Sequence, residues 1–265
     1  MKVIIVLTLL FGFQHSIFCQ VSPIKSYKVK EAKQGVAVDV GYFYVINNSN
    51  IVKYKKGSGE LIVEWLDTTH TLEHLNSGLI VGDSLLSINT NYPESPMASS
   101  LEIFDKHTLK HIGNHSFGIL HGSATWVDKY QGDWYVAFAH YTGRGSTEGK
   151  DNQWTRLVKF DSQWREMEGW ILPKEIVDEF DGRSNSGGVI LSDGKILITG
   201  HDRPILYVLA FPEMGFTLQL VKKVPVSNEG QGIAIEEFDN DLLIYGIRRA
   251  NNEVVITRVP HKELD

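Results

Sequence analysis

The order of apolar and polar residues along the chain repeats five times. In each repeat, small or polar residues precede an apolar run, a turn follows, and a second apolar or aromatic run comes next. Short runs of this kind, bounded by turn residues, are typical of β-strands. The five stretches are QGVAVDVGYFYVIN, NSGLIVGDSLLSIN, GSATWVDKYQGDWYVAFAH, SGGVILSDGKILITGH and GQGIAIEEFDNDLLIYGI.

The spacing of these repeats predicts the fold. Each repeat also carries a third apolar run, usually followed by a further short segment, and four short strands per 40 to 45 residues are typical of a propeller blade. We therefore expect an all-β, five-bladed β-propeller with four-stranded blades. The repeats start at Gly35, Gly78, Ser123, Gly188 and Gly232, which are 43, 45, 65 and 44 residues apart.

Three segments fall outside the regular repeat. Polar insertions around residues 142–153 and 173–185 explain the long third interval, and PKEIVDEF within the second one predicts a short helix. Residues 26–32, SYKVKEA, have no partner strand in the first repeat. We expect this N-terminal segment to supply the outer strand of the last blade and close the ring.

Composition narrows the class of protein. Hydrophobic residues make up 42% of the chain and aromatic residues 11%, and there are 24 glycines, which describes a turn-rich globular protein and not a disordered one. The net charge of −6 comes without a basic stripe, which argues against nucleic acid as a partner. Beyond the N-terminus, no apolar run approaches the length of a membrane span. We expect residues 20–265 to form a single, monomeric domain.

The first nineteen residues form a separate segment. Lys2 is followed by an apolar run and then by polar residues that end at Cys19, a pattern typical of a signal peptide. Cys19 would permit lipid anchoring, but the bulky Phe18 stands where a small residue is usual. We therefore expect cleavage between Cys19 and Gln20, and a secreted or periplasmic mature protein without cysteine.

The predicted propeller places many polar residues on one face. In a blade, the loop leading into the innermost strand and the loop leaving the second strand lie at the same end of the ring, where binding sites are often found. The turn after the second strand of the fourth repeat could be formed by Asn-Gly, but the chain has His201, Asp202 and Arg203 there. Single polar residues at strand ends are common, so it is their coincidence in all five repeats that predicts a functional pocket.

Fourteen residues are candidates for this pocket. We expect catalytic roles for His140, His201, His121, Tyr141 and Asp202. Substrate binding is expected of Gln34, Asn76, Asn89, Arg183, Asn185, Arg203, Gln231 and Arg248. A divalent transition metal would suit four converging imidazoles, those of His74, His121, His140 and His201.

Three stretches resemble the plant and bacterial glutamine cyclotransferase-like five-bladed propellers: QGVAVDVGYFYVINNSNIVKY their first blade, HLNSGLIVGDSLLSI their second and ILITGHDRPILYVL their fourth. The resemblance implies the same architecture. Those enzymes carry a catalytic Glu in a Gly-Glu-Gly-Leu sequence before the second blade, where this chain has Asn76, Ser77, Gly78 and Leu79. The resemblance therefore argues against cyclisation of N-terminal glutamine.

The residue types leave several functions open. Without a metal, a histidine base and Tyr141 or a second histidine as acid, with an arginine holding a carboxylate, would suit lactone hydrolysis, β-elimination from a uronate or a cyclisation. A serine hydrolase is disfavoured because no Gly-x-Ser-x-Gly sequence occurs, and a retaining glycosidase because Asp202 is the single acid at the mouth. We predict an enzyme for a small carboxylated or sugar-derived substrate. The alternative is a non-catalytic propeller that binds a sugar or small anion.

Overall fold

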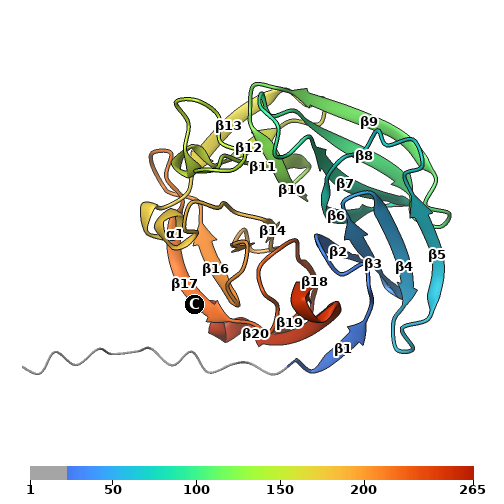
Figure 1. Ribbon diagram of the computed structural model, residues 1–265. Helices are drawn as coiled ribbons and strands as arrows, with labels where there is room; N and C mark the ends of the chain where they lie inside the picture. Colours follow the sequence, from blue (N-terminus) through green and yellow to red (C-terminus); the bar gives the residue numbers. More distant parts are fainter. Residues whose placement is uncertain (1–22) are drawn as a thin grey trace, which may run out of the picture.

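Five four-stranded antiparallel sheets stand around one axis in the computed structural model, which describes residues 23–265 (Figure 1). The predicted five-bladed propeller with four-stranded blades is thereby confirmed. The innermost strand of each blade faces the axis, and the later strands of the blade lie successively further out (Figure 1). The expected signal peptide, residues 1–19, lies outside the described residues.

The blades follow one another along the chain, and in the first four the strands run in order from the innermost to the outermost. Blade 1 is β2 (Gly35–Val38), β3 (Tyr42–Asn47), β4 (Asn50–Lys55) and β5 (Leu61–Leu66); blade 2 is β6 (Leu75–Val81), β7 (Ser84–Thr90), β8 (Ser99–Asp105) and β9 (His111–Gly118). Blade 3 is β10 (Ser123–Tyr130), β11 (Asp133–Ala139), β12 (Arg156–Phe160) and β13 (Glu166–Ile171). Blade 4 is β14 (Gly187–Ile190), β15 (Ile196–Thr199), β16 (Ile205–Ala210) and β17 (Gln219–Pro225).

Blade 5 combines the two ends of the described chain. It contains β18 (Ala234–Glu237), β19 (Asp241–Arg248) and β20 (Glu253–Pro260), and its outer strand is β1 (Lys25–Lys28). The strand β1 pairs antiparallel with β20, with Lys25 opposite Ile256. The expected closure of the ring by an N-terminal strand is confirmed, although the strand ends at Lys28, where the chain turns toward the axis.

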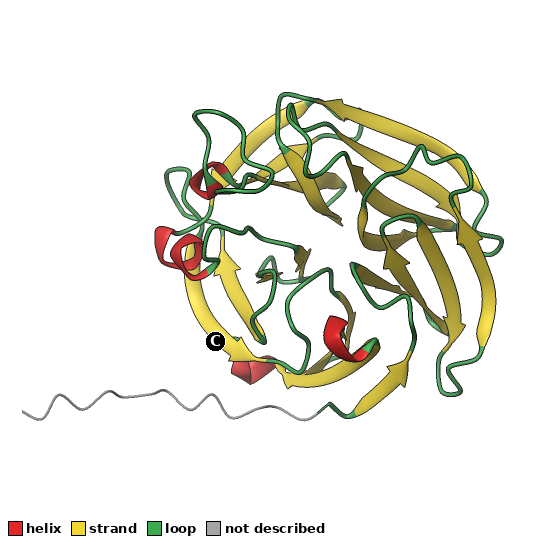
Figure 2. Ribbon diagram, viewed as in Figure 1, coloured by secondary structure: helices red, strands yellow, loops and turns green. Residues whose placement is uncertain are grey.

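The few helical segments lie outside the blades (Figure 2). The helix α1 (Lys174–Glu179) occupies the second predicted insertion and buries Ile176 and Val177. Three single 3₁₀ turns, η1 (Asn152–Trp154), η2 (Arg249–Asn251) and η3 (His261–Glu263), complete the set within residues 23–265. None of these segments is long and apolar enough to cross a membrane.

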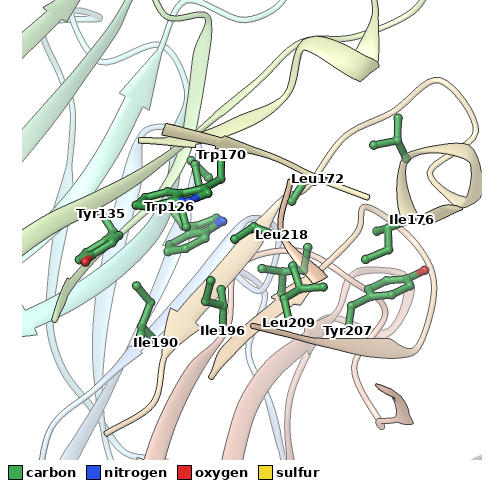
Figure 3. Close-up of a cluster of buried hydrophobic side chains, with 14 of the residues drawn as sticks. Trp126, Tyr135, Trp170, Leu172, Ile176, Ile190, Ile196, Tyr207, Leu209 and Leu218 are labelled. Carbon is green, nitrogen blue, oxygen red and sulfur yellow. The ribbon is translucent and has the colours of Figure 1, made fainter. Parts of the chain in front are cut away.

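The core consists of apolar layers between neighbouring blades. Alternation of side chains along each strand sends every second residue to one face of its blade, where it packs against the facing blade. Between blades 3 and 4, Trp126 lies near Trp170 and faces Ile196 across the layer (Figure 3). Five such clusters of buried side chains hold the ring together within the described chain.

Glycines allow the inner strands to approach each other at the axis. A Cβ atom on Gly35 would lie 2.9 Å from the backbone oxygen of Asn76, and one on Gly232 would lie 3.0 Å from the Cα atom of Gly35. Gly232 also donates its N–H to the carbonyl oxygen of Gln34 at 2.9 Å. The residues just before these strands are thus held close together at one end of the axis.

Candidate functional site

A cavity of about 610 Å³ lies at that end of the axis, bordered by all five blades. Its wall consists of residues that precede innermost strands, residues that follow second strands, and two residues within innermost strands, Asn76 in β6 and Thr125 in β10. Eight of the sequence candidates line it: Gln34, His74, Asn76, Tyr141, Arg183, His201, Asp202 and Gln231. The blade geometry therefore gathers a large part of the predicted set.

His201 occupies the centre of a charged cluster. Its Nδ1 atom lies 2.7 Å from Oδ1 of Asp202, and the other carboxylate oxygen of Asp202 lies 3.2 Å from Nε of Arg183. The Nε2 atom of His201 lies 3.2 Å from Nη1 of Arg183 and 3.5 Å from Nη1 of Arg249. One acid and two guanidinium groups thus surround a single imidazole.

These partners determine which nitrogen of His201 carries the proton. A guanidinium group has only donors, so Nε2 must accept from it. Nδ1 therefore carries the hydrogen and donates it to Asp202. A neutral imidazole with its Nε2 lone pair beside two cationic groups is the result. Burial, Arg249 and Arg183 lower the pKa of His201 more than Asp202 raises it.

Arg249 is held firmly by the chain around it. Its Nε donates to the carbonyl oxygen of Lys33 at 2.7 Å, and its Nη2 lies 3.5 Å from Oε1 of Gln34. Gln231 holds the backbone of His201 by donating from Nε2 to its carbonyl oxygen at 2.6 Å. The position of Arg249 beside His201 is therefore built into the fold and does not depend on a ligand.

The side of the cavity formed by blades 2 and 3 is aromatic. The ring of Tyr92 lies 5.5 Å from that of His74 and 4.9 Å from that of Tyr141, measured between centroids. Burial, together with Arg249 and His201, lowers the pKa of His74 to about 4, so this imidazole is neutral at physiological pH. Burial raises the pKa of Tyr141 to about 12, which keeps its phenol protonated.

The structure places His121 and His140 outside this cavity. His140 is buried, and its Nε2 lies 3.1 Å from the carbonyl oxygen of His121, an approach that Gly122 permits because it has no side chain. His121 is stacked on Phe138, and its Nδ1 accepts from Arg156 at 2.7 Å. Both residues lie next to a strand end, as expected, but their rings do not line the cavity. Their location therefore does not support the catalytic roles expected from the sequence.

Four more candidates lie away from the cavity wall. Asn185 is buried in the inter-blade core, where its Oδ1 accepts from Trp126 at 2.5 Å. Arg248 donates from Nε to the carbonyl oxygen of Ser227, and Arg203 faces Glu179 at 3.8 Å. Asn89 lines a different hollow of blade 2.

The four histidines proposed as metal ligands are not gathered, since His74 and His201 line the cavity and His121 and His140 do not. Within residues 23–265, no group of three or more His, Cys, Asp or Glu side chains is arranged to hold a metal ion. The site as built is suited to binding an anion and to proton transfer.

Several lining residues had not been chosen as candidates. Tyr92, Thr142, Arg144, Asp181 and Gly182 come from loops without a strand pattern, and Thr125 lies within a strand. Arg249 and Ser186 line the cavity as well. Three arginines against two aspartates give the lining an excess of positive charge.

Fold and site together define a five-bladed propeller with a polar, arginine-rich axial cavity. The glutaminyl cyclase of Myxococcus xanthus is similar, with a TM-score of 0.59 and 10% identity over 91% of this chain and 97% of its own. A luciferin-regenerating enzyme is similar with a TM-score of 0.50 and 8% identity, over 89% and 95%. Family models and curated sequences give no match. The expected resemblance to glutamine-cyclising propellers is confirmed, and at these identities it shows the fold alone.

Proposed function

We propose that the protein is a secreted acid–base enzyme that removes the proton next to the carboxylate of a small or sugar-derived acid and eliminates a β-oxygen substituent. Such a reaction is the β-elimination of a uronate. The observation that carries the proposal is the placement of the Nε2 lone pair of His201 beside the guanidinium groups of Arg183 and Arg249.

The two arginines suit the carboxylate. Guanidinium groups bind carboxylates through paired, charge-assisted hydrogen bonds, which are stronger than neutral ones. In the structure, their inward N–H groups are directed at Nε2 of His201, a neutral acceptor. A carboxylate is the better acceptor, so its binding there would free the lone pair of Nε2.

This position selects the atom that the base can reach. Nε2 of His201 lies within 3.5 Å of both arginine nitrogens, so a carboxylate bound to them brings its α-carbon next to Nε2. The same guanidinium groups stabilise the negative charge that develops on the carboxylate oxygens when the α-proton leaves. Asp202 stabilises the imidazolium that forms.

Tyr141 is the acid of the proposed reaction. The C–H electron pair forms the Cα=Cβ double bond, and the Cβ–O bond breaks with its electrons remaining on oxygen. The phenol of Tyr141, protonated because its pKa is about 12, gives its proton to this oxygen. His201 then returns the abstracted proton to water, and Tyr141 takes one back. No oxidant or reductant is required.

The experiment follows α-proton exchange and elimination separately. The protein is incubated in D₂O with β-hydroxy acids, uronates and 4-linked oligouronates, and deuterium at the α-carbon is measured by NMR while ultraviolet absorbance reports the unsaturated product. His201→Gln should lower the rate by about 10²- to 10⁴-fold, the usual contribution of a general base. Binding of the acid, measured by calorimetry, should change little in this variant.

The matched arginine variants test the carboxylate site. Arg249→Gln should weaken binding about tenfold or more, the loss of one charge-assisted hydrogen bond. Arg203→Gln is the control, because this arginine faces Glu179 outside the cavity. Acids that bind through Arg249 but never exchange or eliminate would show a binding protein and overturn the enzymatic proposal.

A further inference from the structure

A second hollow crosses the same blade that supplies His74. It consists of a groove of about 450 Å³ between the outer parts of blades 1 and 2 and an adjoining one of about 200 Å³. The two share Thr71, Asn89 and Ser100 in their walls. They therefore form one continuous surface groove, which we call the blade-2 groove. None of its lining residues belongs to the axial cavity.

The floor of this groove is a preorganised polar network. Glu102 is buried, and both of its carboxylate oxygens have partners. Oε2 lies 2.7 Å from Nε2 of His111, and Oε1 accepts from the hydroxyl of Ser100 at 2.5 Å. Asn89 joins the network by directing its side-chain amide to Ser100 at 3.4 Å. All four side chains line the groove. Their positions are fixed by contacts to one another before any ligand binds.

The rest of the wall combines one aromatic ring with hydroxyl and amide groups. Trp65 is partly exposed in the groove and packs against Phe104 with 4.9 Å between ring centroids. Thr68 and Asn114 are exposed beside it. An aromatic face suits the C–H face of a sugar ring, and neighbouring hydroxyl and amide groups suit its hydroxyls, which donate and accept together.

The charges of the groove exclude other small ligands. Neither lysine nor arginine lines it within residues 23–265, so an anion finds no partner there. Among the described lining residues, a cation would find a single exposed carboxylate without a partner, that of Glu73. Asp67 already accepts hydrogen bonds from Thr69, Thr71 and Leu72, and Glu102 is occupied as described. The other groups left for a ligand are neutral.

We infer that the blade-2 groove binds a neutral oligosaccharide chain. Its hydroxyl and amide groups, spread over two adjoining hollows, suit several sugar units, and Trp65 provides the stacking surface. The groove also shares a wall with the axial cavity. Glu73 and Asn91 line the groove, whereas their chain neighbours His74 and Tyr92 line the cavity. The inference rests on the groove alone and holds whatever chemistry the cavity performs.

Glycan binding by the intact protein tests the inference. An array of neutral and anionic glycans is probed first, and neutral hexasaccharides that bind are then measured by calorimetry. Asn114→Ala removes an exposed groove amide that makes no side-chain hydrogen bond within the described residues. Trp65→Phe keeps an aromatic ring against Phe104 while shrinking the stacking face. Each should weaken binding about tenfold, the loss of one good contact.

Matched substitutions outside the groove serve as controls. Trp154→Phe changes an exposed tryptophan, 53% accessible, and Asn240→Ala changes an exposed asparagine in the turn between β18 and β19. Both should leave glycan affinity unchanged, as should His201→Gln in the axial cavity. Absence of neutral glycans from the array hits, or affinities unmoved by both groove variants, would overturn the inference. A wild-type protein that binds glycans in the groove but shows no elimination activity would instead count against the proposed function alone.

Discussion

Asp202 lies 2.7 Å from Nδ1 of His201, and this contact decides what the axial cavity can do. It leaves the Nε2 lone pair on the side where Arg183 and Arg249 lie. Because Asp202 also faces Nε of Arg183, the base and one of the two carboxylate-binding groups are oriented by the same acid. A small change in this acid should therefore alter both proton affinity and binding geometry.

Replacing Arg249 with glutamine should raise the pKa of both cavity histidines. The positive charge of Arg249 lowers the pKa of His74 and of His201 alike, so its removal makes both imidazoles easier to protonate. Nitrogen chemical shifts followed against pH by NMR would show both titrations moving to higher pH. The neutral form of His201 would then persist over a narrower pH range, because its protonation would begin at a higher pH.

Arg203→Gln is the control for this titration. Arg203 pairs with Glu179 away from the cavity, so neither histidine should move. Equal shifts in the two variants would mean that Arg249 acts only through the net charge of the protein. Unchanged pKa values in Arg249→Gln would contradict the position of this side chain beside His201.

Asp202→Asn should lower the pKa of His201 further and slow proton abstraction. The negative charge and hydrogen bond of Asp202 raise this pKa against burial, so their loss favours the neutral ring. His201 remains unprotonated at neutral pH, but it becomes a weaker base whose tautomer is no longer fixed. We expect α-proton exchange in D₂O to fall about 10- to 100-fold, a part of what a general base supplies. An unchanged exchange rate would remove Asp202 from the mechanism.

The repeat pattern predicted the fold because blade geometry follows from properties that a sequence carries directly. Strand length, alternation and turn residues determined the five blades, and the unpaired N-terminal segment indicated how the ring closes. Position relative to a strand end also placed Gln34, His201 and Gln231 at the correct face. Each of these features is determined by residues that are close together in the sequence.

Side-chain direction at strand ends could not be predicted in the same way. Arg248 and Arg249 are neighbours, yet the first bonds to Ser227 and the second faces the cavity. Arg248 is the last residue of β19, whereas Arg249 begins the 3₁₀ turn η2, so the backbone changes direction between them. Which of the two faces inward depends on where the strand ends, which the pattern of apolar residues indicates only to within a residue. Tyr92 and Arg144 come from loops whose path is set by tertiary contacts.

Asn185 should prove to be a structural residue. Its side chain accepts from Nε1 of Trp126 and donates to the carbonyl oxygens of Gly187 and Thr199, both at 2.8 Å. Asn185→Ala would leave these buried groups without their partner and should lower the free energy of unfolding by about 2–4 kcal/mol. Urea unfolding measures the loss. A stable variant with weakened carboxylate binding would restore the role in substrate binding expected from the sequence.

Asp128 connects two blades below the axial cavity. It is buried on β10, and its Oδ2 accepts from the backbone N–H of Ile190 on β14 at 2.6 Å. Its Oδ1 accepts from the N–H of Lys129 at 2.8 Å. Burial raises the pKa of this carboxyl from 3.8 to about 6 even though both hydrogen bonds favour the charged form. The folded protein therefore holds a proton here at pH values where the unfolded chain has released it.

Asp128→Asn should consequently remove a pH dependence of stability. Between about pH 4 and pH 6 the folded state binds more protons at this site than the unfolded state, so the free energy of unfolding falls as pH rises through this window. The stabilisation is complete below pH 3.8 and lost above pH 6, and a shift of this size corresponds to about 3 kcal/mol. Urea unfolding at a series of pH values gives the difference between wild type and Asp128→Asn, in which the contributions of other carboxyl groups cancel. The stability of the wild type relative to this variant should fall by that amount across the window, whereas parallel curves would show that Asp128 titrates as it does in the unfolded chain.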